Sequence, residues 1–183
     1  VGDQGGPFSY PGDYFSAEAP EKYKIKGSFG HPVPVVDGKT QSSGAKASAI
    51  VLKKEFTDVK DLLCIDYTSA YSTPSLDKLV RTFVYDRQGK GSFTVGDEFT
   101  ANAPIRFETA ITTQANWKII DDTHLLLTTG TEQMTVTIEA SGKVAFTSET
   151  IEVNSPAYTR IGISLKEQSK DGYIRLTMRT KQL

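Results

Sequence analysis

Apolar and polar residues alternate along several segments of this chain. Met134, Val136 and Ile138 are apolar, and the residues between them are not. The same period of two recurs at 161–165 and at 174–178. Because successive side chains of a strand point to opposite faces, this pattern places one face in a core and the other in water. We therefore predict half-buried antiparallel strands at these segments.

Weaker versions of the same pattern extend the all-β interpretation along the chain. Further strands are expected at about 47–56, 60–67, 80–87, 91–99, 104–113, 117–120 and 124–129. The segment 60–67 is apolar on both faces, which favours a central strand that is covered on both sides. One turn of helix is expected at Pro74 to Leu79, just before the strand that begins at Val80.

Short turn signals separate the expected strands. They are Asp37-Gly38, Gln88-Gly89, Ser141-Gly142 and Asp171-Gly172. Glycine is favoured in tight hairpin turns because these turns need a positive φ. Many short strands, frequent turns and the lack of a fixed repeat predict an all-β, two-layer antiparallel β-sandwich of about 10–13 strands.

The beginning of the chain has a different character. Residues 1–20 are rich in Gly, Pro and Asp and show no clear period. They nevertheless carry large rings at Phe8, Tyr10, Tyr14 and Phe15. Such rings are costly to leave in water, so this irregular N-terminal segment is expected to pack against either the sandwich or a partner domain.

The counts of charged residues narrow the classes of partner. The 183 residues include 21 Lys and Arg and 22 Asp and Glu, which gives a formal net charge of -1. This balance provides neither the basic field that binds nucleic acid nor a polybasic patch for a membrane, so we expect neither partner. No apolar run approaches the length that crosses a bilayer. The single cysteine, Cys64, excludes a disulfide within the chain.

Few residues are placed to carry chemistry. Of the two histidines, His124 follows a polar turn and is interpreted as a solvated strand end. His31 lies in Gly30-His31-Pro32-Val33-Pro34, where a glycine and two prolines fix the backbone. Two interpretations of His31 stay open: a structural histidine that bonds a loop carbonyl, or a functional imidazole held in a set orientation. Asp3, which has glycines on either side, is either a turn residue or a second metal ligand.

Several of these segments resemble one known family. Gly2-Asp3-Gln4-Gly5-Gly6 and the run from Ser28 to Gln41, SFGHPVPVVDGKTQ, are similar to the signature of bacterial heparinase II/III-like polysaccharide lyases. Ala70-Tyr71 and the segments 81–85 and 95–99 are also similar to that family. The similarity covers nearly the whole chain and is most specific in residues 1–45 and 80–99.

The resemblance implies a fold, a reaction and partners. Members pair an N-terminal α/α toroid with C-terminal β-sandwich layers, and they cleave acidic polysaccharides by β-elimination in the cleft between the two. Residues 1–183 would then be one C-terminal β-sandwich domain, with 1–20 as the lead-in from a missing toroid. An acidic polysaccharide and the chain's own toroid are the expected partners. The location would be periplasmic or secreted, with the cytoplasm as the alternative, and the isolated fragment is expected to be inactive.

The resemblance also assigns candidate site residues. Asp3 matches the aspartate of the family's Gly-Asp segment, and His31 matches the histidine of its Ser-x-x-His pattern. In metal-containing members these two positions bind zinc together with an upstream histidine, so zinc is expected in the full-length protein and no tight binding is expected for this fragment. Tyr10 and Tyr14 are both candidates for the catalytic tyrosine that lines the cleft. The chain departs from many members at Pro32, where they carry asparagine.

Two other functions fit the same sandwich. It could be a non-catalytic carbohydrate-binding module that stacks sugars on exposed aromatic residues such as Trp117, Tyr158 or Tyr173. It could also be a structural module that supports a catalytic domain elsewhere. No cluster of Lys and Arg marks a highly sulfated ligand.

Overall fold

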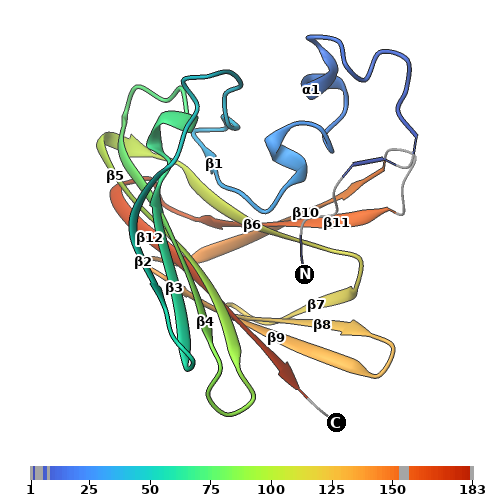
Figure 1. Cartoon of the computed structure of the whole chain (residues 1–183), viewed down its shortest axis with the longest axis vertical. Helices are drawn as coiled ribbons and strands as arrows, with labels where there is room; N and C mark the ends of the chain where they lie inside the picture. The colour runs from blue at the N-terminus through green and yellow to red at the C-terminus, as the bar shows by residue number, and fades with distance from the viewer. Residues whose placement is uncertain (1, 3–5, 8, 153–156, 182–183) are drawn as a thin grey trace.

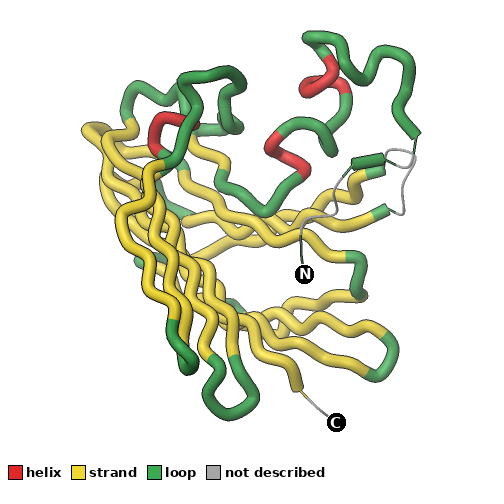
Figure 2. Tube along the Cα trace, in the orientation of Figure 1, coloured by secondary structure: helices red, strands yellow, loops and turns green. Residues whose placement is uncertain are grey.

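The computed structural model describes residues 2, 6–7, 9–152 and 157–181. In this part of the chain, twelve strands form two antiparallel sheets of eight and four strands (Figure 1). Strands make up both layers, and the few helical turns lie in the connecting segments (Figure 2). The predicted all-β sandwich is therefore confirmed, with a strand number inside the expected range.

The larger sheet has the order β2-β3-β4-β5-β12-β9-β8-β7. Its strands are β2 (Ile50–Phe56), β3 (Lys60–Asp66), β4 (Leu76–Asp86), β5 (Ser92–Ile105), β7 (Asn116–Asp121), β8 (His124–Thr129), β9 (Glu132–Ala140) and β12 (Ser169–Lys181). The smaller sheet has the order β1-β6-β11-β10. Its strands are β1 (Val35–Val36), β6 (Phe107–Thr113), β10 (Val144–Ile151) and β11 (Tyr158–Leu165).

The core lies between the two sheets and follows the predicted alternation. In β12, Ile174 and Leu176 are buried, whereas Arg175 between them is exposed. Across the core, Phe99 of β5 stacks on Phe107 of β6 with 4.6 Å between ring centroids. Period-two burial on both sheets thus joins them through a single apolar layer.

The helix turn expected at Pro74 to Leu79 is wrong, because β4 already begins at Leu76. A β-bulge between Leu76 and Lys78 shifts the register of β4 against β5. The bulge buries Leu76 and Leu79, three residues apart, and this spacing imitates that of a helix. The short 3-10 helix in this region, η2, lies earlier, at Thr68–Ala70.

The segment 60–67 is not a fully covered central strand. β3 is the second strand from one edge of the larger sheet, and its residues are half-buried or exposed. The edge strand beside it, β2, is exposed along its whole length. A sheet of four strands cannot cover a sheet of eight, so the apolar residues of β3 are shielded only in part.

The turn signals have mixed outcomes. Asp37 and Gly38 have φ values of 50° and 73°, and Val36 bridges Lys39 across them, as a two-residue hairpin requires. The turn expected at Asp171-Gly172 is wrong, because both residues lie inside β12. A Cβ on Gly172 would come within 2.8 Å of the Ser141 Oγ, so glycine is needed there for close packing.

The N-terminal segment, residues 9–34, packs on the outer face of the smaller sheet, beside β6, β10 and β11 (Figure 1). It contains α1 (Ala19–Lys22) and the 3-10 helix η1 (Ser28–Gly30). Its contact with the sheet is a second apolar cluster built around Tyr14, Ile25, Ile151 and Tyr158. Of the two expected packing partners, the sandwich is therefore confirmed.

Candidate functional site around the His31 loop

The His31 loop, residues 28–34, links the N-terminal segment to β1. Gly30 lies directly against the backbone that precedes it: a Cβ there would come within 2.3 Å of the Lys24 carbonyl oxygen. Only glycine permits so close a backbone approach. The sequence Gly30-His31 therefore sets the imidazole of His31 beside the turn at Lys24 and Ile25.

A backbone carbonyl contacts the His31 ring. Its Nε2 lies 3.1 Å from the carbonyl oxygen of Ile25. A carbonyl only accepts, so Nε2 carries the proton and donates, and in the neutral ring Nδ1 is then an acceptor. Metal-binding histidines are commonly fixed in this way by a carbonyl on the other nitrogen. The same contact also fits a structural histidine, so both interpretations from the sequence remain.

A buried polar network holds the loop to the core. The Nη1 of Arg81 donates to the carbonyl oxygen of Pro32 at 2.8 Å. The same guanidinium makes two hydrogen bonds to the Asp97 carboxylate, at 2.7 and 2.8 Å. Asp97 also accepts from the Tyr67 hydroxyl and the Thr109 hydroxyl, each at 2.7 Å. The Arg81–Asp97 ion pair of the larger sheet is thus hydrogen-bonded both to Thr109 of the smaller sheet and to the loop.

A second tyrosine holds the other end of the loop. The Tyr71 hydroxyl donates to the carbonyl oxygen of Pro34 at 2.8 Å, and its ring meets the Tyr67 ring edge-on. Burial, reinforced by the Asp97 charge, raises the pKa of Tyr67 well above its ordinary value, and burial also raises the pKa of Tyr71. Both phenols stay protonated near neutral pH and act as fixed donors.

Sequence reasoning assigned no role to Arg81, Asp97 or Tyr67. A signal was nevertheless present, because Arg81 occupies an inward position between Leu79 and Phe83 in the alternation of its strand. A charge in the inward phase of an apolar strand needs a buried partner. The segments 81–85 and 95–99, which carried part of the family resemblance, supply the two halves of the ion pair.

A second buried cation lies under the loop, on the outer face of the smaller sheet. Arg160 of β11 is only 2% exposed, and its Nη1 donates to the Glu108 carboxylate at 2.7 Å. Its guanidinium lies 4.3 Å from the ring centroid of Phe29. Gly162 leaves room for this pairing, because a Cβ there would come within 2.7 Å of the Glu108 carboxyl carbon.

The predicted catalytic tyrosines lie together but in different surroundings. Tyr10 is 58% exposed and Tyr14 is 6% exposed, and their ring centroids are 5.0 Å apart. Burial raises the pKa of Tyr14 above its ordinary value. Tyr14 packs with Ile25, whose carbonyl holds His31, so the structure links the tyrosine pair to His31 through one residue.

The predicted metal ligands are placed only in part. Asp3 lies outside the described residues. Among the residues that are described, no group of three or more His, Cys, Asp and Glu side chains is arranged to hold a metal. The zinc expected from the family resemblance therefore stays a prediction.

The aromatic residues expected to be sugar platforms have separate outcomes. Tyr158 is buried, and its hydroxyl donates to the Gly30 carbonyl, so it cannot stack on a ligand and this prediction is wrong. Trp117 packs partly against the core. Tyr173 is 38% exposed on the outer face of the larger sheet.

The described helices include none that is long and apolar enough to cross a membrane.

Solved structures share this architecture. A heparan sulfate lyase, HepC from Pedobacter heparinus, matches with a TM-score of 0.73 and 13% identity over 97% of this chain. The chain shares its fold with heparinase III. Two heparinase III structures match with TM-scores of 0.72 and 0.68, at 13% and 16% identity, over 97% and 92% of the chain. The resemblance stated from the sequence is thus confirmed for the fold.

The remaining comparisons set the limits of that similarity. No protein-family model matches the sequence, and no curated protein matches it. The chain covers 28% of the HepC chain and 27% and 26% of the two heparinase III chains, so it spans about a quarter of their length.

Proposed function

We propose that this chain is the β-sandwich module of a polysaccharide lyase that cleaves uronic-acid-containing glycosaminoglycan by β-elimination. The observation that carries the proposal is the match of nearly the whole chain to the fold of heparinase III and of a heparan sulfate lyase. The rigidly held His31 loop, which contains the most specific part of the family signature, supports it.

In this proposal, the module supplies one side of a composite active site. The chain spans about a quarter of the matched lyases, and the remaining catalytic groups would come from an α/α toroid in the same polypeptide. The enzyme would act in the periplasm or outside the cell. The isolated module would be inactive, because β-elimination needs a base, an acid and neutralisation of the uronate carboxylate together.

Tyr10 is the better candidate for the tyrosine that meets the substrate. Its ring is largely exposed, whereas Tyr14 is buried and has a raised pKa, which disfavours its use as a base. Tyr14 would instead support the Tyr10 ring at 5.0 Å. An exposed tyrosine can give a proton to the leaving sugar oxygen as a phenol, or accept one from the carbon next to the carboxylate as a phenolate.

In this proposal the contact between Nε2 of His31 and the Ile25 carbonyl orients the imidazole. We propose Asp3 and His31 as zinc ligands, completed by a histidine from an upstream part of the polypeptide. Bound zinc would fix the loop and provide positive charge near the substrate carboxylate. The chemistry of the residue fits this role, because a neutral imidazole with an oriented second nitrogen is a common zinc ligand.

The test is the rate of unsaturated uronate formation by the complete natural polypeptide carrying His31→Ala. We expect a loss of about 10- to 100-fold, the usual effect of disturbing a metal ligand or its support. His124→Ala is the matched control, because His124 lies at a strand end and pairs with Asp121 at 2.9 Å. Unchanged lyase activity in a folded His31→Ala variant would remove His31 from the mechanism.

A further inference from the structure

Gly96 occupies a position where the structure gives no internal reason for glycine. It lies within β5, and the pairing of β5 with β4 and β12 runs through it without a bulge. Its φ is not in the left-handed region, and the three atoms nearest to a Cβ there would all belong to the Arg175 side chain, the first at 3.6 Å, an ordinary contact. Gly162 and Gly172 differ, because a Cβ at either would lie within 2.8 Å of a neighbour.

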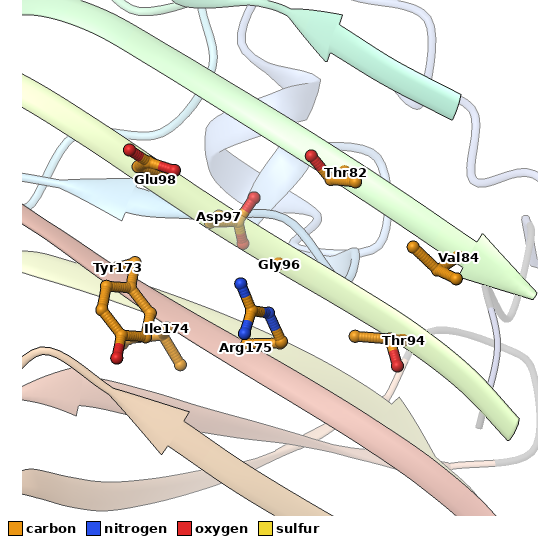
Figure 3. Close-up of a pocket in the computed structure, with 9 residues that line it drawn as sticks. All are labelled: Thr82, Val84, Thr94, Gly96, Asp97, Glu98, Tyr173, Ile174 and Arg175. Atoms are coloured by element: carbon orange, nitrogen blue, oxygen red, sulfur yellow. The ribbon is translucent and has the colours of Figure 1, made fainter. Parts of the chain in front are cut away.

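Glycine inside a strand weakens it, and it often marks a place where a ligand approaches the backbone. At Gly96 the missing side chain opens a hollow of about 280 Å³ on the outer face of the larger sheet. Figure 3 shows the side chains around it, which come from three adjacent strands. Besides Gly96, the lining residues are Thr82 and Val84 of β4, Thr94, Asp97 and Glu98 of β5, and Tyr173, Ile174 and Arg175 of β12.

The side chains around the hollow suit a sugar ring. Tyr173 offers an exposed aromatic ring to the apolar C–H face of a pyranose. Thr82 and Thr94 carry hydroxyls, Glu98 can accept hydrogen bonds from sugar hydroxyls, and Arg175 can donate to a carboxylate. An apolar platform surrounded by a few oriented polar groups is the usual composition of a small-ligand site.

The charges at the hollow select among acidic sugars. Arg175 is the one cation among the residues that line it, and its Nη1 already donates to Glu139 at 3.0 Å. Glu98, in the same lining, would repel further anionic groups. One uronate carboxylate can therefore be paired with Arg175, whereas sulfate groups would find no additional cation.

We propose that this hollow, the Gly96 hollow, is a second saccharide-binding site that holds an unsulfated uronic-acid-containing unit of the polysaccharide. The proposal rests on the proposed function for its polymer class. The hollow opens on the solvent face of the larger sheet, whereas the His31 loop lies on the side of the smaller sheet. The site would retain the polymer away from the place of cleavage.

The test measures binding of two hexasaccharides to the 183-residue chain by titration calorimetry. One is an unsulfated repeat of glucuronate and N-acetylglucosamine, and the other is a fully sulfated repeat of the same length. Gly96→Val should fill the hollow without disturbing the strand, and Tyr173→Ala should remove the platform. We expect each substitution to weaken binding of the unsulfated hexasaccharide at least 10-fold. The melting temperature of each variant should be no lower than that of a matched control variant.

Tyr85→Ala is that control. Tyr85 lies on the same sheet and is 45% exposed, and Arg87 lies over its ring at 4.9 Å, much as Arg175 lies near Tyr173 at 5.8 Å. It does not line the hollow. We expect Tyr85→Ala to bind as the original chain does.

Several results would overturn the Gly96 hollow as a site. These are no measurable binding by the original chain, unchanged binding by Gly96→Val and Tyr173→Ala, an equal loss in Tyr85→Ala, or tighter binding of the sulfated hexasaccharide. The proposed lyase function is tested separately. If the complete polypeptide lacks lyase activity and Gly96→Val still loses binding, the hollow stands and the lyase assignment falls.

Discussion

Asp97 shows how a single buried charge can organise the loop that carries His31. Its carboxylate accepts hydrogen bonds from Arg81, Tyr67 and Thr109, two at each oxygen. A buried charge is tolerated only when it is paired and hydrogen-bonded in this way. Because Arg81 also holds the Pro32 carbonyl, the ion pair connects the sandwich core to the His31 loop.

Removing one partner of this pair should be severe. Asp97→Ala leaves the Arg81 guanidinium buried without its counter-charge, and we expect a loss of about 3–5 kcal/mol in the free energy of unfolding. Glu55→Ala is the control, because the Lys53–Glu55 pair is exposed and should contribute about 0–1 kcal/mol. Urea unfolding of the two variants measures the difference. A loss below about 1 kcal/mol for Asp97→Ala would show that the network does not stabilise the fold.

Individual elements show which sequence signals were sufficient. The alternation at 174–178 and the Asp37-Gly38 turn depend on neighbours in sequence, and both appear as expected. The bulge at Leu76 and the close packing at Gly172 depend on the facing strand, so local patterns misled there. The Arg81–Asp97 pair likewise requires the register of β4 against β5, in which these residues are direct partners.

The candidate site likewise combines features that the local sequence predicts with features that it does not predict. The rigidity of the His31 loop could be predicted from Gly30 and the two prolines, because their backbone limits are local. The roles of Tyr67 and Tyr71 could not, since these residues flank η2, more than thirty residues after the loop. Tyr71 donates to the loop at Pro34, and Tyr67 donates to Asp97. Family resemblance pointed to Tyr71 and to the segments 81–85 and 95–99 without giving their physical role.

The N-terminal segment should behave as a separate element. It contacts the smaller sheet through its own apolar cluster, in which Ile25 is nearly fully buried. Ile25→Ala should therefore speed amide hydrogen exchange in residues 9–31 while the exchange of β12 stays slow, as expected for local opening. Ile119→Ala, in the exposed edge strand β7, is the control and should change neither region. Equal acceleration in β12 would mean that the segment and the sandwich unfold together.

At the scale of the whole molecule, the buried tyrosines should make the free energy of unfolding fall at alkaline pH. The pKa of Tyr67 is raised in the folded state, whereas an unfolded tyrosine has a pKa of about 10. Its contribution to stability is therefore fully present below about pH 10 and is lost as the pH rises from there toward the folded pKa. Loss of stability in this window is expected because unfolding releases the proton.

Tyr67→Phe isolates this effect. The variant should lose part of the decline in unfolding free energy between about pH 8 and about pH 11 that the original chain shows. Urea unfolding at the two pH values gives the slopes. Tyr85→Phe serves as the control for the loss of a tyrosine hydroxyl at an exposed position. Identical slopes for Tyr67→Phe and the original chain would contradict the raised pKa.

The most direct test of the lyase assignment is the chemical structure of the new chain ends that the complete natural polypeptide produces from an unsulfated glucuronate-containing polysaccharide. Mass spectrometry distinguishes elimination from hydrolysis, because an elimination product is lighter by one water and carries a double bond in its terminal uronate. We predict unsaturated uronate ends. Saturated ends, or a polysaccharide left intact by the folded enzyme, would contradict the account.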